Sequence, residues 1–104
     1  MRTITTTLIL SIIAMPLQAG DWRKTCGSVG ELATTIMESR QSGVSMAKMM
    51  GAVSGEENSL AEKLIISAYD SPRYSTERMQ KRTVEEFRDE VYLECVKAMR
   101  SQEK

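Results

Sequence analysis

Apolar residues recur at steps of three and four along the stretch 26–37, and this period indicates one face of an α-helix. The positions on that face are Cys26, Val29, Leu32, Ala33, Ile36 and Met37. Gly43 follows where the helix should end, because glycine takes the left-handed conformation of a helix C-terminus without steric cost. Ser45 then predicts the N-cap of a second, short helix. The chain therefore reverses over residues 41–45, and the absence of a basic recognition face argues against a DNA-reading corner.

Two more helices follow from the pattern downstream. Ser59 with Glu62 forms a capping box, although the helix could begin as early as Glu56. Its inner stripe is predicted to be Leu60, Ala61, Leu64, Ile65, Ala68 and Tyr69. Pro72 ends this segment, and Ser75 or Thr76 caps the last helix. That helix carries the apolar stripe Met79, Val84, Phe87, Val91, Cys95, Ala98 and Met99.

The first nineteen residues have the features of a signal peptide. Arg2 supplies a positive start, residues 8–15 form an apolar core, and Ala19 is a small residue suited to signal peptidase. Cleavage after Ala19 leaves residues 20–104 as one small helical domain with 13 basic and 14 acidic residues, a net charge of −1. This balance gives no argument for binding nucleic acid or an anionic membrane surface. The alternative is an uncleaved membrane anchor.

An even number of cysteines in an exported chain predicts a disulfide, here between Cys26 and Cys95. Such a bridge would tie the first helix to the last and would stabilise the domain by roughly 4 kcal/mol in the chain-entropy model. The alternative is a pair of free or metal-binding thiols, but the chain has no histidine to complete a zinc site. The predicted fold is therefore all-α, a compact bundle of four helices with the first and last joined by one disulfide.

The residue inventory argues against an enzyme and against a cofactor or metal site. Histidine, the usual general base, is absent, and no phosphate-binding loop or nucleophile elbow occurs. Adjacent acids such as Glu85 and Glu86 point about 100° apart on a helix and do not converge on one substrate atom. Methionines cluster at Met46, Met49 and Met50. They predict plain core packing, with a partner groove or a copper(I) site as the alternatives.

The loop after the third helix has the composition of a protein-binding patch. Tyr69, Arg73 and Tyr74 are residue types that dominate binding hot spots, and Arg40 is a weaker candidate. Pro72 would stiffen this loop and lower its ordering cost on binding. The alternative is a structural role, in which Tyr69 ends the core stripe and Arg73 pairs with Asp70.

Four short motifs occur in order after Cys26. They are residues 36–46, IMESRQSGVSM, residues 68–75, AYDSPRYS, then Glu86-Phe87, and Tyr92-Leu93-Glu94-Cys95. In these four motifs and Cys26, the chain resembles a group of small exported helical proteins with two cysteines. These proteins are uncharacterised and are encoded by tailed phages and proteobacteria. The resemblance implies a Gram-negative periplasm and a phage genome as the setting, and it brings no activity and no assigned functional residues.

Together these observations predict a small periplasmic module that binds another protein, without a cofactor. If it is phage-encoded, the expected tasks are modulating the host envelope, excluding a second phage or regulating lysis. The alternative is a periplasmic stress chaperone of the small, helical, disulfide-bonded type. An enzyme is a distant third.

The first testable prediction concerns export and oxidation. Protein recovered from the periplasm of a Gram-negative host should have the intact mass of a chain that begins at Gly20, less the hydrogens lost when the disulfide forms. Thiols that react with a maleimide reagent in the native protein would contradict the predicted bridge. A mass that includes residues 1–19 would instead favour the anchor.

Overall fold

The computed structural model describes residues 21–53 and 59–102. In this part of the chain it contains four helices and no strand: α1 (Asp21–Gln41), α2 (Met46–Ala52), α3 (Leu60–Tyr69) and α4 (Glu77–Ser101). The prediction of an all-α fold of four helices is confirmed. The predicted signal peptide lies outside the described residues.

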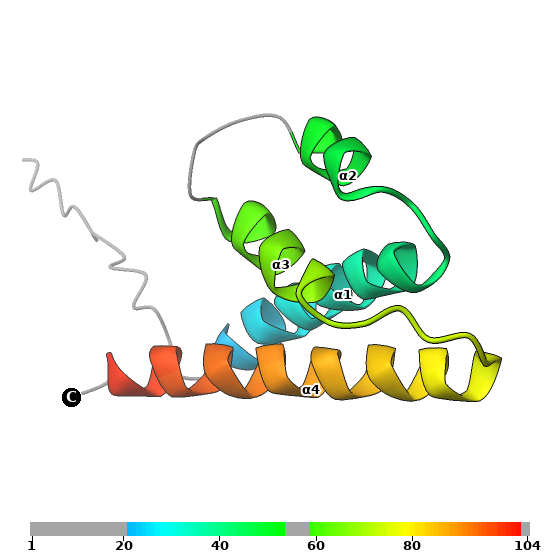
Figure 1. The fold of residues 1–104 in the computed structure, drawn as a ribbon. Helices are drawn as coiled ribbons and strands as arrows, with labels where there is room; N and C mark the ends of the chain where they lie inside the picture. Colours follow the sequence, from blue (N-terminus) through cyan, green and yellow to red (C-terminus); the bar gives the residue numbers. More distant parts are fainter. Residues whose placement is uncertain (1–20, 54–58, 103–104) are drawn as a thin grey trace, which may run out of the picture.

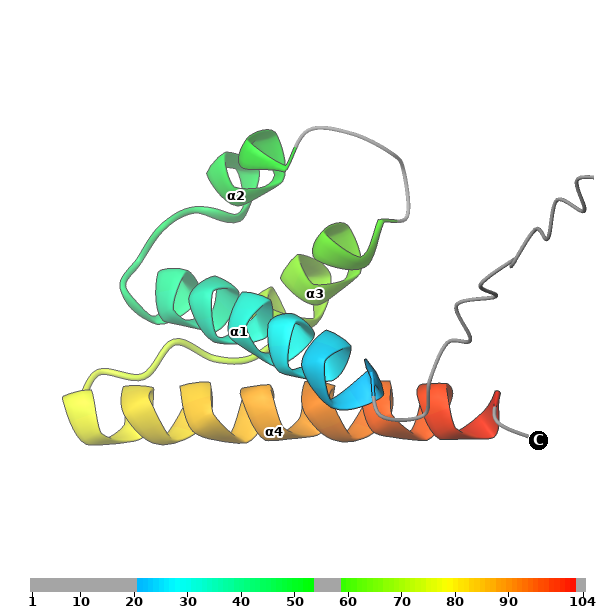
Figure 2. The same ribbon diagram turned by 180° about the vertical axis from the view of Figure 1, so that it is seen from behind.

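Helix α1 is the central element (Figure 1). It packs against α4 on one side and against α3 on the other, while α2 contacts α3 at the edge farthest from α4. The view from behind shows the same order, with α4 as a long base beneath α1 (Figure 2). At 1.5 Å per residue, α4 is roughly 37 Å long and α3 only about 15 Å. Helix α4 is therefore much longer than α3.

Three helices begin at the hydroxyl caps that the sequence indicates. Ser45, Ser59 and Thr76 each have extended backbone angles, and each side-chain oxygen accepts a hydrogen bond from the N–H three residues later, at 3.1–3.2 Å. These bonds satisfy donors that a helix N-terminus leaves without an internal partner. Of the two candidates for the last cap, Thr76 is the one used.

The end of α1 confirms the role predicted for Gly43. This glycine has φ of +97°, in the left-handed region. The Val44 N–H donates to the carbonyl of Ser39 at 3.0 Å and the Gly43 N–H donates to that of Arg40 at 3.2 Å, the two bonds of a Schellman motif. The chain thus turns sharply here with its last carbonyls satisfied.

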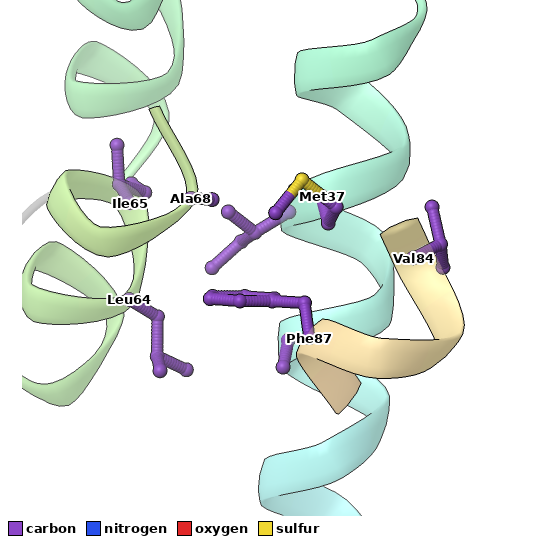
Figure 3. Packing of buried hydrophobic residues seen from close by; sticks show 8 residues of the cluster. Met37, Leu64, Ile65, Ala68, Val84 and Phe87 are labelled. Carbon is purple, nitrogen blue, oxygen red and sulfur yellow. The ribbon is translucent and has the colours of Figure 1, made fainter. Parts of the chain in front are cut away.

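The core lies where α1 meets α3 and α4 (Figure 3). Phe87 extends from α4 toward α3, where Leu64 and Ile65 lie, and Met37 of α1 lies near its ring. Val84 belongs to the same cluster but lies one turn earlier on α4, on the side away from α3. The other buried members are Ala33, Ile36 and Ala68. Helix α2 buries no residue fully; its Met49 and Met50 pack against the edge of the core. Core packing, the main prediction for the methionines, holds for Met37 fully and for these two in part, and it was wrong for Met46, which is 37% exposed at the start of α2.

Two positions of the predicted stripes are not inside. Leu60 is 49% exposed, and Ala98 is also exposed. Both predictions of burial were wrong for the same reason. Helix α3 is anchored through Leu64, Ile65 and Ala68, and neither Leu60 in its first turn nor Ala98 near the end of α4 belongs to the core cluster of the described residues.

The disulfide between Cys26 and Cys95 is present, with the two Cα atoms 5.6 Å apart. It joins the N-terminal part of α1 to the C-terminal part of α4, so the two helices run antiparallel. Gly30, one turn further along α1, faces Arg88 and Tyr92 of α4. The described residues include no free cysteine. A structural disulfide of this kind belongs to an oxidising, extracellular-type environment.

The second prediction concerns this bridge. Cys95→Ser should lower the free energy of unfolding by about 2–5 kcal/mol, because the bridge closes a loop of 69 residues. Urea titration followed by circular dichroism measures the change, and the double variant Cys26→Ser with Cys95→Ser is the control for thiol side reactions. Equal unfolding midpoints for Cys95→Ser and the oxidised wild type would show that the bridge is dispensable.

Candidate functional site

The structure brings the four residues of the predicted binding patch together at one end of the molecule. There the C-terminus of α1 meets residues 70–76, which connect α3 to α4. We call this region the loop junction, defined by Arg40, Gln41, Tyr69, Arg73 and Tyr74. The side chains of all of these residues except Tyr74, which bonds through its backbone, make hydrogen bonds within the molecule, and this is the structural alternative that the sequence left open.

Arg40 and Tyr69 fix the end of α3 to the end of α1. The Arg40 guanidinium donates from Nε and Nη2 to the carbonyl of Ser71, at 3.1 and 2.9 Å, and lies 5.1 Å from the centre of the Tyr69 ring. The Tyr69 hydroxyl donates to the carbonyl of Val44 at 2.6 Å. Burial raises the pKa of Tyr69, and the nearby Arg40 charge opposes this only partly. The phenol therefore stays protonated and able to donate at neutral pH.

Arg73 closes the junction from the other side. Its Nε donates to the carbonyl of Gln41 at 2.9 Å, and a cation is favourable at this negative end of the α1 dipole. The guanidinium also occupies the space next to Gly43, where an added Cβ would lie 3.1 Å from Nη2. Among the ion pairs of residues 21–53 and 59–102, none joins Arg73 to Asp70. Arg73 thus has a structural role, as one prediction had it, but its partner is the carbonyl of Gln41 and not Asp70.

Gln41 is the centre of the junction, although it was not among the predicted site residues. Its side chain is only 2% exposed. Nε2 donates to the carbonyl of Pro72 at 2.9 Å, and Oε1 accepts from the N–H of Tyr74 at 2.8 Å. The carbonyl of Tyr74 in turn accepts from Gln80 of α4 at 2.6 Å. The amide thereby takes the place of a backbone partner for the connecting loop.

A second surface is an apolar groove between α3 and the C-terminal half of α4. It has a volume of about 470 Å³. Its walls and floor are formed by Val29, Leu60, Leu64, Ser67, Phe87, Glu90, Val91, Glu94, Cys95, Ala98 and Met99. Leu60, the position wrongly predicted to be buried, forms part of the α3 wall. We call this feature the α3–α4 groove.

The charge of the α3–α4 groove has one sign. Of the described residues that line it, the two charged ones are Glu90 and Glu94, both on α4. Glu94 contacts Lys97 at 3.8 Å across an exposed i,i+3 pair, and Glu90 takes part in none of the ion pairs found among the described residues. An apolar floor with acidic groups on one side is a surface suited to binding.

A second hollow, of about 400 Å³, lies between α1 and the N-terminal half of α4. Charges of both signs line it, including Glu38, Lys81, Glu85 and Arg88. The mixture gives no net preference for an anion or a cation. Within the described ranges, no three His, Cys, Asp or Glu residues lie close enough to hold a metal ion, and no helix has the length and apolar character needed to cross a membrane.

The chain matches no protein-family model, and no curated protein or solved structure is significantly similar to it.

Sequence signals for these two surfaces existed in part. Gln41 lies four residues after Met37 and continues the buried face of α1, which places a polar side chain where a core residue is expected. The signal for the α3–α4 groove was the apolar stripe on α4, which continues to Met99. The predicted third helix is too short to cover all of this stripe. A binding role for Tyr69, Arg73, Tyr74 and Arg40 stays a prediction.

The third prediction concerns the loop junction. Gln41→Ala should lower the free energy of unfolding by roughly 1–3 kcal/mol, because it leaves the Pro72 carbonyl and the Tyr74 N–H without their partner. Thermal and urea unfolding measure the effect. Gln102→Ala, which removes an exposed glutamine at the end of α4, is the matched control and should change stability by less than about 0.5 kcal/mol. Equal effects of the two variants would show that Gln41 does not hold the junction.

Proposed function

We propose that this protein is an exported, disulfide-stabilised module that acts by binding another protein, with no catalytic step of its own. The observation that carries the proposal is the α3–α4 groove. A small domain normally uses its apolar stripes to build its core, and here part of two stripes stays uncovered. Leu60, Ala98 and the half-buried Val91 and Met99 gather in one hollow rather than being scattered.

The setting we propose is the periplasm of a Gram-negative bacterium. The predicted signal peptide and the disulfide support export, since a bridge of this kind forms in an oxidising compartment. The resemblance to small exported proteins of tailed phages supports a phage genome. In that setting, binding an envelope protein would modulate the host envelope, exclude a second phage or regulate lysis.

A stress chaperone is the second candidate, and the exposed apolar side chains favour it. Ile66 and Leu93 are about half exposed on the outer faces of α3 and α4, in addition to Leu60 in the groove. A chaperone would suppress aggregation of unrelated proteins after acidification, whereas a specific binder would leave such aggregation unchanged. A light-scattering assay with two unrelated client proteins separates the two functions.

The fourth prediction locates the binding surface. Cross-linked partners captured from periplasmic extract by the oxidised protein should be lost with Leu60→Asp and retained with Ile66→Asp. Leu60 and Ile66 have nearly equal size and exposure, 49% and 51%, but only Leu60 lines the groove, so the variants differ mainly in which surface they change.

Tyr74→Ala tests the loop junction in the same experiment. The ring is removed while the backbone bonds from Gln41 and Gln80 are kept, so helicity and melting should change little. If the loop junction is the binding surface, capture falls with Tyr74→Ala and not with Leu60→Asp. Partners retained by all three variants would remove both surfaces from consideration.

A further inference from the structure

We infer that the α3–α4 groove binds an amphipathic helix that carries lysine or arginine beside its apolar stripe. This inference rests on the proposed function and adds the chemistry of the partner. It starts from the arrangement of the helices. Helix α1 packs against both α3 and α4, and the groove is the space that remains between those two outer helices. In a four-helix bundle a further helix fills that position, but α2 packs at the far side of α3 and leaves it open (Figure 1).

The length of the groove fits a helix of a few turns. The lining residues of α4 run from Phe87 to Met99, a span of roughly 18 Å at 1.5 Å per residue. About three turns of a bound helix would lie along this span and would present apolar side chains at i, i+3 or i+4, and i+7. Phe87 forms the floor, and Figure 3 shows it directed toward Leu64 on the opposite wall.

The charges that line the groove indicate which charged residues the partner should carry. Glu90 and Glu94 lie one turn apart on the same side of α4, so their carboxylates form an acidic edge along the apolar floor. Basic residues one turn apart on the partner would face both. Complementary charges at such an edge set the orientation of the bound helix and raise the association rate.

A second copy of this chain is a poorer occupant. A symmetric dimer through the groove would use the same patch on both subunits. It would bring Glu90 and Glu94 of both copies into one interface, where like charges repel. The acidic edge therefore favours a different, basic partner.

The test uses the oxidised protein isolated from the periplasm and two synthetic peptides of about five helical turns. Both peptides carry leucine at i, i+4, i+7 and i+11. One has lysine at the positions that flank this stripe, and the other has glutamate there. Isothermal titration calorimetry should show binding of the lysine peptide that weakens as salt is raised, and affinity for the glutamate peptide should be at least about tenfold lower.

Matched variants connect that binding to the groove. Leu60→Asp should weaken the lysine peptide roughly tenfold or more, whereas Ile66→Asp should not. The double variant Glu90→Lys with Glu94→Lys should weaken it by roughly two- to fivefold per charge. Glu86→Lys with Asp89→Lys changes the net charge equally at exposed positions that do not line the groove and should have little effect. Circular dichroism confirms that each variant is folded.

Several outcomes would overturn the inference. Equal affinity for the two peptides would show that the acidic edge does not select the partner. Self-association that Leu60→Asp abolishes would make the second copy the occupant. If the isolated protein still carries residues 1–19 and binds only after their removal, the chain's own N-terminal segment would be the occupant. If neither peptide binds while Leu60→Asp still abolishes capture of periplasmic partners, the inference fails and the proposed function stands.

Discussion

The antiparallel packing of α1 against α4 is the constraint on which the rest of the structure depends, and it is fixed at both ends. The disulfide from Cys26 to Cys95 holds one end, and the hydrogen bonds of Gln41 to the loop before α4 hold the other. Neither helix can slide along the other without breaking a covalent bond or exposing a buried amide. Helix α3 packs on this pair through only a few core residues, so its position depends on the α1–α4 frame.

The uncovered apolar surface is a consequence of unequal helix lengths. Helix α4 is 25 residues long and α3 is 10, so the apolar stripe of α4 continues where α3 does not cover it. The N-terminal part of that stripe, at Val84 and Phe87, is buried, while Val91 and Met99 are only half-buried. The same disulfide that stabilises the pair also holds this end of α4 next to α1. The α3–α4 groove is therefore built on the rigid part of the fold.

Local signals predicted the helices well, because caps and turns depend on residues close in sequence. The Ser45, Ser59 and Thr76 caps, the left-handed Gly43 and the pairing of the two cysteines were all predictable. The hydrophobic period predicted which face of each helix points inward. It does not show how far along the helix that face is packed against another helix, and for this reason Leu60 was wrongly predicted to be buried. Gln41 was missed because its partners, Pro72 and Tyr74, lie more than thirty residues away.

The polar residues that fix the end of α1 and the exposed apolar residues proposed for binding are thus different residues of a very small domain. The polar atoms of Arg40, Gln41 and Tyr69 are used within the molecule, and a partner that captured them would have to break those bonds. Leu60 and the half-buried Met99 of the α3–α4 groove lie outside the core cluster of the described residues, and within the structure they remain partly open to water. Because the walls of the groove are already helical, a partner would cause little ordering of this protein on binding. The free energy of covering the apolar floor would then appear largely as affinity, which is why we propose the groove rather than the loop junction as the binding surface.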